Sequence, residues 1–158
     1  ILVLGNGGVG KAVLSQVHDR LLNDYTSMKV YSATRKLNKS FYNNFPKVNI
    51  VNWVDRHQFI NSKTLIINCT SLGDYENLNY SPIDYRYLLK TNYPIGIYDV
   101  IYNPSITKLS EWSNKNNILY VNGLEMNLLQ ASIAFKLSTN INKSNSEIKK
   151  MMLNEDLN

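Results

Sequence analysis

Cysteine is almost absent from this 158-residue sequence: Cys69 stands alone, so no disulfide can form within the chain. That usage favours a reducing compartment, and we expect a cytoplasmic protein. Long apolar runs are also lacking, because stretches such as 64–67 are far too short to cross a bilayer. No signal peptide precedes the first residues, which already have the pattern of a strand, so we expect that a segment upstream of Ile1 is missing.

Acidic residues are the minority charge. The sequence has 17 Lys and Arg against 12 Asp and Glu, which gives a formal net charge of +5 and a pI of about 9.2. These cations are scattered, apart from the groups at 35–39 and 149–150, so the chain lacks the long basic stripe of a nucleic-acid binder. We therefore expect a local site for a phosphorylated small molecule and no nucleic-acid partner.

Short apolar runs alternate with segments of helical pattern along most of the chain. The expected strands are 1–4, 28–32, 48–51, 64–68, 95–100 and 118–121. The expected helices are 11–22, 35–43, 55–60, 83–89, 105–114, 126–137 and 146–153. This alternation predicts an α/β fold, a doubly wound Rossmann-type parallel sheet of about six strands with flanking helices. We expect this domain to cover 1–139 and to be followed by a polar tail or short helix at 140–158.

A glycine-rich turn joins the first strand to the first helix. Gly5, Gly7 and Gly10 have the spacing G-x-G-x-x-G, in which the glycines permit a tight turn, backbone approach to a pyrophosphate and close helix packing. The helix that follows offers unpaired N–H groups and a positive dipole end to an anion. We interpret the loop as a dinucleotide site; the alternative is a turn that serves packing only. The apolar face of this helix is expected to hold Ala12, Val13, Val17, Leu21 and Leu22.

The end of the second strand indicates which dinucleotide is bound. NAD binders usually carry an Asp or Glu there for the ribose 2′-hydroxyl. This sequence has no carboxylate at that point and instead carries Arg35, Lys36 and Lys39. A guanidinium can bind a 2′-phosphate through two hydrogen bonds, so we expect NADP. The alternative is that these cations are simply solvated.

Five segments, in the right order, resemble the NADP-binding half of the shikimate and quinate/shikimate dehydrogenase family over residues 1–139. They are Gly5–Ala12, Thr34–Lys39, Asn68–Gly73, Asp99–Thr107 and Asn122–Gln130. Thr34 and Lys36 depart from the family's N-R-T-x-x-[KR] segment, and Asp74 stands where the family usually has Met.

The resemblance implies a role for each matching residue. Tyr102 and Gln130 would contact the substrate, shikimate or 3-dehydroshikimate. The cofactor site would comprise Gly5, Asn6, Gly7, Gly8, Val9, Gly10, Thr34, Arg35, Lys39, Asn68, Thr70, Ser71, Gly73, Gly123 and Met126. The implied activity is hydride transfer between NADPH and 3-dehydroshikimate in aromatic amino-acid (chorismate) biosynthesis. Quinate remains an alternative substrate.

The same resemblance implies that catalytic residues are missing from this chain. In the family a Lys and an Asp of a separate N-terminal substrate domain act as acid and base, and neither that domain nor a local substitute is found here. His18 and His57 are interpreted as packing or surface residues, and one Cys with two distant His predicts no metal site. The 126–137 helix is expected to pack toward the missing domain or to pair with a second copy in a homodimer. A stand-alone NADP-binding module without catalysis is the alternative function.

Overall fold

The computed structural model describes residues 1–23, 27–36 and 39–154. Its backbone forms two compact units, Ile1–Asn122 and Gly123–Asn158. The boundary at 139 that the sequence suggests remains a prediction. No helix among the described residues is long and apolar enough to cross a membrane.

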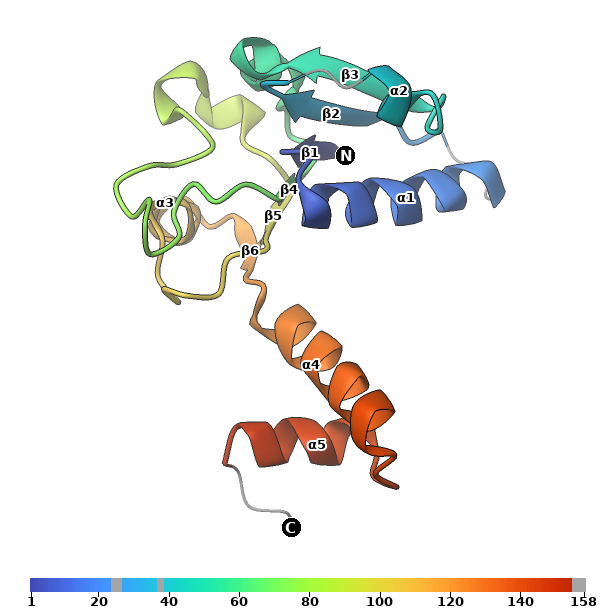
Figure 1. Ribbon diagram of the computed structural model, residues 1–158. Coiled ribbons are helices and arrows are strands. Elements are labelled where there is room, and N and C mark those ends of the chain that lie inside the picture. The colour runs from blue at the N-terminus through green and yellow to red at the C-terminus, as the bar shows by residue number, and fades with distance from the viewer. Residues whose placement is uncertain (24–26, 37–38, 155–158) are drawn as a thin grey trace. The chain divides into compact units, whose positions relative to one another are not determined.

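The first unit is built on six parallel strands (Figure 1). They are β1 (Leu2–Leu4), β2 (Val30–Thr34), β3 (Val48–Asn52), β4 (Leu65–Asn68), β5 (Gly96–Asp99) and β6 (Leu119–Val121). Their order is β3-β2-β1-β4-β5-β6, so the chain runs outward from β1 first in one direction and then in the other. The predicted doubly wound sheet is thus confirmed. Ligands of such sheets bind beyond the carboxyl ends of the strands where the order reverses, here between β1 and β4.

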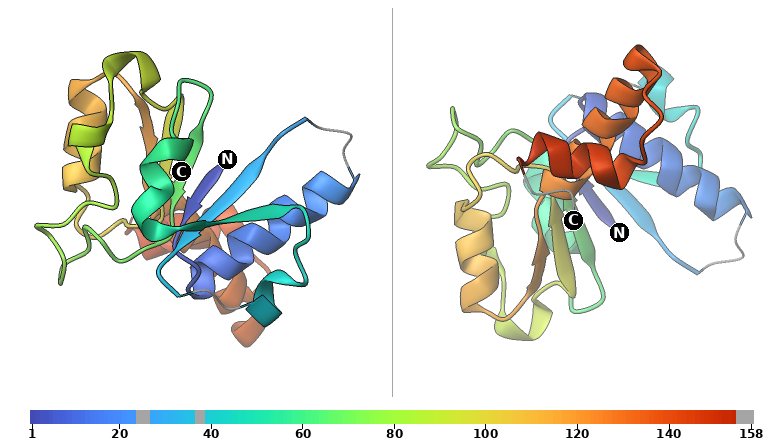
Figure 2. Two further views of the ribbon diagram at one scale, coloured as in Figure 1. Left: turned by 90° about the horizontal axis from the view of Figure 1, so that it is seen from above. Right: turned by 90° about the horizontal axis from the view of Figure 1, so that it is seen from below.

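Two layers of helices cover the sheet (Figure 2). They are α1 (Gly8–Asn23), α2 (Lys39–Tyr42), α3 (Lys108–Lys115) and the 3-10 helices η1 (Trp53–Phe59), η2 (Tyr85–Tyr87) and η3 (Lys90–Asn92). Side chains alternate along β1, so Val3 packs with α1 and α2 on one face, while Leu2 and Leu4 pack with α3 and η1 on the other. β1 is therefore buried on both faces, as its unbroken apolar sequence predicts.

The buried face of α1 differs from the predicted one. Ala12 is exposed and Leu22 is 55% exposed, so their assignment to the core was wrong. The helix begins at Gly8 rather than Lys11, and its contact with the Gly5 turn fixes its rotation about the axis. The residues that face the sheet are Gly10, Leu14, His18 and Leu21. His18 packs edge-on against Phe45 with ring centroids 5.3 Å apart, in agreement with a packing role.

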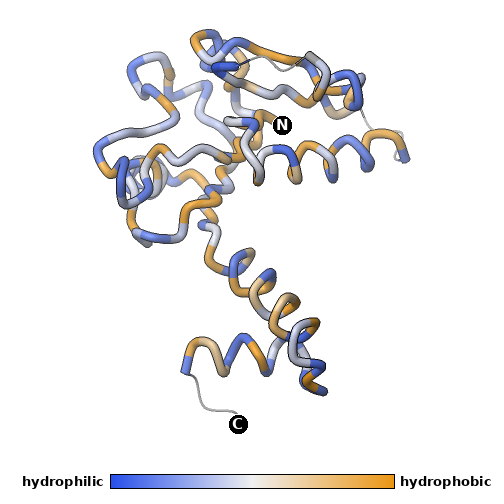
Figure 3. The backbone as a smooth tube through the Cα atoms, viewed as in Figure 1, coloured by the Kyte–Doolittle hydropathy of each residue, from blue (hydrophilic) through white to orange (hydrophobic). Residues whose placement is uncertain are grey.

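The second unit contains α4 (Leu124–Thr139) and α5 (Asn145–Met152). A reciprocal hydrogen-bonded cap between Ser144 and Glu147 starts α5, whose Ile148 is buried. Lys149 forms an ion pair of 2.6 Å with Glu125 of α4. Apolar residues recur along α4 (Figure 3), and Leu129, Ile133 and Leu137 on it are exposed. The expected packing of these residues against a missing domain or a second copy remains a prediction.

Alanine at Gly10 tests the packing of α1 on β1. A Cβ at this position would collide with the backbone carbonyl of Gly5, and that carbonyl cannot move without distorting the turn. We expect Gly10→Ala to lower the free energy of unfolding by at least about 2 kcal/mol in urea titrations. Gly8→Ala is the matched control, because a Cβ there meets nothing within 4 Å, and its stability should stay within about 1 kcal/mol of wild type. Equal stability of the two variants would contradict the prediction.

Candidate functional site

In the glycine loop, Gly7 and Gly8 have free space beside the backbone, whereas Gly5 and Gly10 are tightly packed. Gly5 adopts a φ of +92°, which favours glycine, and its N–H donates to the Ala33 carbonyl at 2.9 Å. Gly7 and Gly8 have no neighbouring atom where a Cβ would stand, so a ligand can approach this backbone closely. Because α1 begins at Gly8, the first N–H groups of the helix have no partner within the helix and suit an anion.

A cavity of about 610 Å³ adjoins this loop, a volume typical of small-molecule sites. It lies where β1, β2, β3 and β4 end. Its lining consists of Gly5, Asn6, Gly7, Thr34, Arg35, Lys36, Trp53, Cys69, Thr70, Ser71 and Leu72. None of these residues is acidic and two carry positive charge, so the cavity favours an anionic ligand.

The turn after β2 is held by its own hydrogen bonds. The Thr34 hydroxyl donates to the Lys36 carbonyl at 3.1 Å and accepts from the Lys36 N–H at 3.3 Å. The Asn6 side chain also donates to the Lys36 carbonyl, at 3.2 Å, which ties the glycine loop to this turn. Arg35 and Lys36 are exposed at the cavity. The side chain of Lys39, the other predicted cation, lies outside the described part of the chain.

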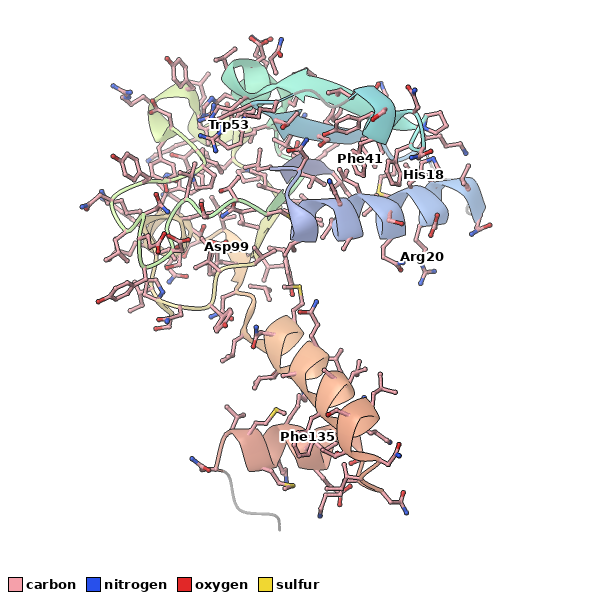
Figure 4. All side chains as sticks on the ribbon, viewed as in Figure 1. His18, Arg20, Phe41, Trp53, Asp99 and Phe135 are labelled. Carbon is pink, nitrogen blue, oxygen red and sulfur yellow. The ribbon has the colours of Figure 1, made fainter. Side chains whose placement is uncertain are left out.

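A buried polar network supports the opposite wall. Asp99, fully buried near the centre of the first unit (Figure 4), accepts hydrogen bonds from Asn68 at 2.9 Å and from Tyr120 at 3.0 Å. The Asn68 side-chain oxygen in turn accepts from the N–H and the hydroxyl of Thr70, at 3.1 and 2.7 Å. These bonds join β6 to the ends of β4 and β5, and they fix Thr70 in the cavity wall. Burial raises the pKa of Asp99, although hydrogen bonds from Ile101, Asn68 and Tyr120 oppose the shift.

A second hollow of about 490 Å³ shares Cys69, Thr70 and Ser71 with the first, so the two adjoin. Tyr102, predicted to contact substrate, lines this hollow and is 42% exposed. Burial raises the pKa of the Cys69 thiol to about 12, so it is a neutral wall group and not a nucleophile at neutral pH.

The structure brings most of the predicted cofactor residues of the first unit together. Those that line the first cavity are Gly5, Asn6, Gly7, Thr34, Arg35, Thr70 and Ser71, while Val9 lines the second hollow. Gly10, Asn68 and Gly73 lie behind these surfaces as support. Gly123, Met126 and Gln130 belong to the second unit, and their approach to the cavity remains a prediction.

Four lining residues were not in the predicted site: Lys36, Trp53, Cys69 and Leu72. Lys36 had a signal, as one of the cations after the second strand. Cys69 and Leu72 lie within the Asn68–Gly73 segment, so that the motif itself pointed to them. For Trp53 the only signal is its place directly after a strand.

Comparison with known proteins identifies relatives of most of the chain, although no protein-family profile matches it. A curated protein of Caldicellulosiruptor bescii, named shikimate dehydrogenase (NADP(+)), is 33% identical over 132 residues, which are 83% of this chain and 44% of that protein. The crystal structure of shikimate dehydrogenase 1 from Peptoclostridium difficile matches with a TM-score of 0.74 and 26% identity, over 93% of this chain and 50% of that one. Most of this chain is thus similar in sequence and fold to about half of a shikimate dehydrogenase. It spans about half the length of the curated relatives it matches.

A related structure extends the comparison. The chorismate mutase/shikimate 5-dehydrogenase fusion protein from Clostridium acetobutylicum matches with a TM-score of 0.71 and 26% identity, over 97% of this chain and 53% of that one. The resemblance to shikimate dehydrogenases that the five sequence segments indicate is therefore confirmed.

Asp99→Asn tests the electrostatics of the network. Because the pKa of Asp99 in the folded chain lies above its ordinary value of 3.8, its contribution to stability is full below about pH 4 and is lost as the pH rises through the folded-state pKa. Asparagine keeps an acceptor for Asn68 and Ile101 without a buried charge. We expect the free energy of unfolding of the variant, relative to wild type, to rise as the pH is raised above about 4 in urea titrations.

Asp84→Asn is the control with the opposite sign. The side-chain hydrogen bond from Arg86 lowers the pKa of the half-buried Asp84 to about 2, so its contribution is present above about pH 4 and is lost as the pH falls toward the lowered pKa. This variant should become less stable relative to wild type as the pH rises. A difference between wild type and Asp99→Asn that does not change with pH would contradict the assignment.

Proposed function

We propose that this chain is the NADP-binding part of a shikimate dehydrogenase-like oxidoreductase, which transfers hydride between NADPH and 3-dehydroshikimate. The observation that carries the proposal is a single cavity in which a glycine loop and a cationic, non-acidic strand end meet. Relatives at about 30% identity bear the name shikimate dehydrogenase (NADP(+)), which agrees with this chemistry. The proposed setting is aromatic amino-acid biosynthesis in the cytoplasm.

The residues of the cavity fit the cofactor. Gly7 and Gly8 leave room for a pyrophosphate against the backbone, and the start of α1 supplies N–H donors. Arg35 at the end of β2 offers a planar pair of donors for a 2′-phosphate. The reduced nicotinamide, when bound, supplies the hydride. The chain itself binds, orients and partly shields the dinucleotide.

The second hollow suits the nicotinamide end and the substrate. Thr70 and Ser71 form the wall between it and the first cavity, and Tyr102 offers a hydroxyl to a polyhydroxylated ring. Gly123, Met126 and Gln130 would complete this end from the second unit. The residues that line the hollow include the carboxylates of Asp74 and Glu76 but no lysine or histidine. The Lys and Asp that the family resemblance implies as acid and base would therefore be supplied by another part of the protein.

Arg35→Ala tests the cofactor preference. Loss of a charge-assisted pair of hydrogen bonds should raise the Kd for NADP by about 10- to 100-fold, measured by calorimetric titration. The Kd for NAD, which has no 2′-phosphate, should stay nearly unchanged. Arg20→Ala, which removes the same charge on the last turn of α1, should leave both affinities at wild-type values. Equal affinity of the wild-type chain for NADP and NAD would refute the proposal.

Turnover by this chain alone is a separate test, because it distinguishes a binding domain from a complete enzyme. We expect the 158-residue chain to bind NADP and yet to form no NADPH when shikimate is added, as followed by absorbance of the reduced nicotinamide. Measurable NADPH formation would show that the chain contains its own acid–base group. Supplying the rest of the protein should restore turnover; failure to do so would favour a stand-alone NADP-binding module.

A further inference from the structure

Trp53 lines the same cavity as Arg35 and Lys36 but has no role in the cofactor binding described so far. It is the first residue of η1, directly after β3, and its ring is partly buried against the core on that side of the sheet (Figure 4). An aromatic ring at the edge of a polar cavity offers a flat apolar surface. A flat apolar surface is what a purine base needs.

The register of the sheet brings Trp53 beside Arg35. Thr34 on β2 and Asn52 on β3 are paired in the parallel ladder, and each is the last residue of its strand. The next residues, Arg35 and Trp53, therefore leave adjacent strands at the same edge. Neighbouring parallel strands lie about 4.8 Å apart, which is close enough for one nucleoside to reach both residues.

Arg56 fixes the indole in place. Its guanidinium lies over the Trp53 ring, 4.2 Å from the centroid. Two backbone carbonyls hold it there, because Nη1 donates to Trp53 at 2.6 Å and Nε donates to Pro82 at 2.7 Å. Trp53 lines the cavity and Arg56 does not, so part of the Trp53 side chain is left to face a ligand. A ring held in this way loses little side-chain entropy when a base stacks on it.

We propose that Trp53, backed by Arg56, is the stacking platform for the adenine base of the bound dinucleotide. The inference rests on the proposed function, in which Arg35 holds the 2′-phosphate. In NADP the same ribose carries both the 2′-phosphate and the adenine, so a base attached to a phosphate at Arg35 lies within reach of the next strand end. Trp53 thus contributes affinity for the base, while Arg35 distinguishes the two cofactors.

Fluorescence of Trp53 gives a direct test. The chain has two tryptophans, and the other, Trp112, stacks on Tyr85 and does not line the cavity. In a Trp112→Phe background, adenosine 2′,5′-bisphosphate should quench the remaining emission with a Kd close to that measured calorimetrically. Nicotinamide mononucleotide, which lacks the adenine, should leave the emission unchanged. Calorimetric binding of the bisphosphate with no change in Trp53 emission would overturn the proposal.

Substitution supplies the second measurement. Trp53→Leu should raise the Kd for adenosine 2′,5′-bisphosphate by roughly 10-fold, because base–aromatic stacking is lost. Trp53→Phe should restore most of the affinity, and Trp112→Phe should bind as wild type. A folded Trp53→Leu chain, checked by circular dichroism, with wild-type affinity would refute the adenine platform. If Trp53→Leu does not fold, the fluorescence titration decides.

The two proposals fail in different ways. Loss of the Trp53 effect with an intact Arg35 effect leaves an NADP site whose base is held elsewhere. Failure of the wild-type chain to bind either NADP or the bisphosphate removes the proposed function itself.

Discussion

The close approach of α1 to the turn after β1 is the constraint on which the rest of the site depends. Gly10 lies against the Gly5 carbonyl with no room for a side chain. This contact sets the rotation of α1 about its axis. It also directs the unpaired N–H groups of α1 toward the carboxyl ends of the strands. It also explains why His18 is buried while Leu22, a far more apolar residue, is exposed. Backbone geometry overrides side-chain hydropathy on this helix.

The opposite wall of the cavity depends on hydrogen bonds. Asn68 and Thr70 stand on a buried chain of polar groups that ends in Asp99 and Tyr120. A buried carboxylate without partners is costly, but each oxygen of Asp99 accepts at least one hydrogen bond. The network therefore gives a loop that faces solvent a definite shape. Because Thr70 lines both hollows, the hydrogen bonds that hold Thr70 help to shape the wall of each.

Sequence reasoning succeeded where chemistry is local along the chain. The strand pattern, the glycine turn and the cations after the second strand each lie within a few consecutive residues, and the structure places them in one parallel sheet with one cavity. It failed where the outcome depends on helix rotation, as at Ala12, or on the order of strands. Trp53 reaches the cavity because β3 lies beside β2, and no local sequence pattern predicts that pairing. The placement of Gln130 likewise depends on how the second unit meets the first, and the helical periodicity of the sequence does not determine that arrangement.

The residues of the proposed dinucleotide site come from neighbouring strand ends. Leu4 pairs with Ala33 and Asn68, while Thr34 pairs with Asn52, so β1, β2, β3 and β4 end at nearly the same level. Each strand end can then present a different chemistry: bare backbone at Gly5, positive charge at Arg35, an aromatic ring at Trp53 and hydroxyls from Thr70 onward. The contacts of the glycine loop with the end of β2 go to the backbone carbonyls of Ala33 and Lys36, so side chains at this strand end can change while those contacts are kept. The departures from the family pattern at Thr34 and Lys36 lie in this replaceable part of the site.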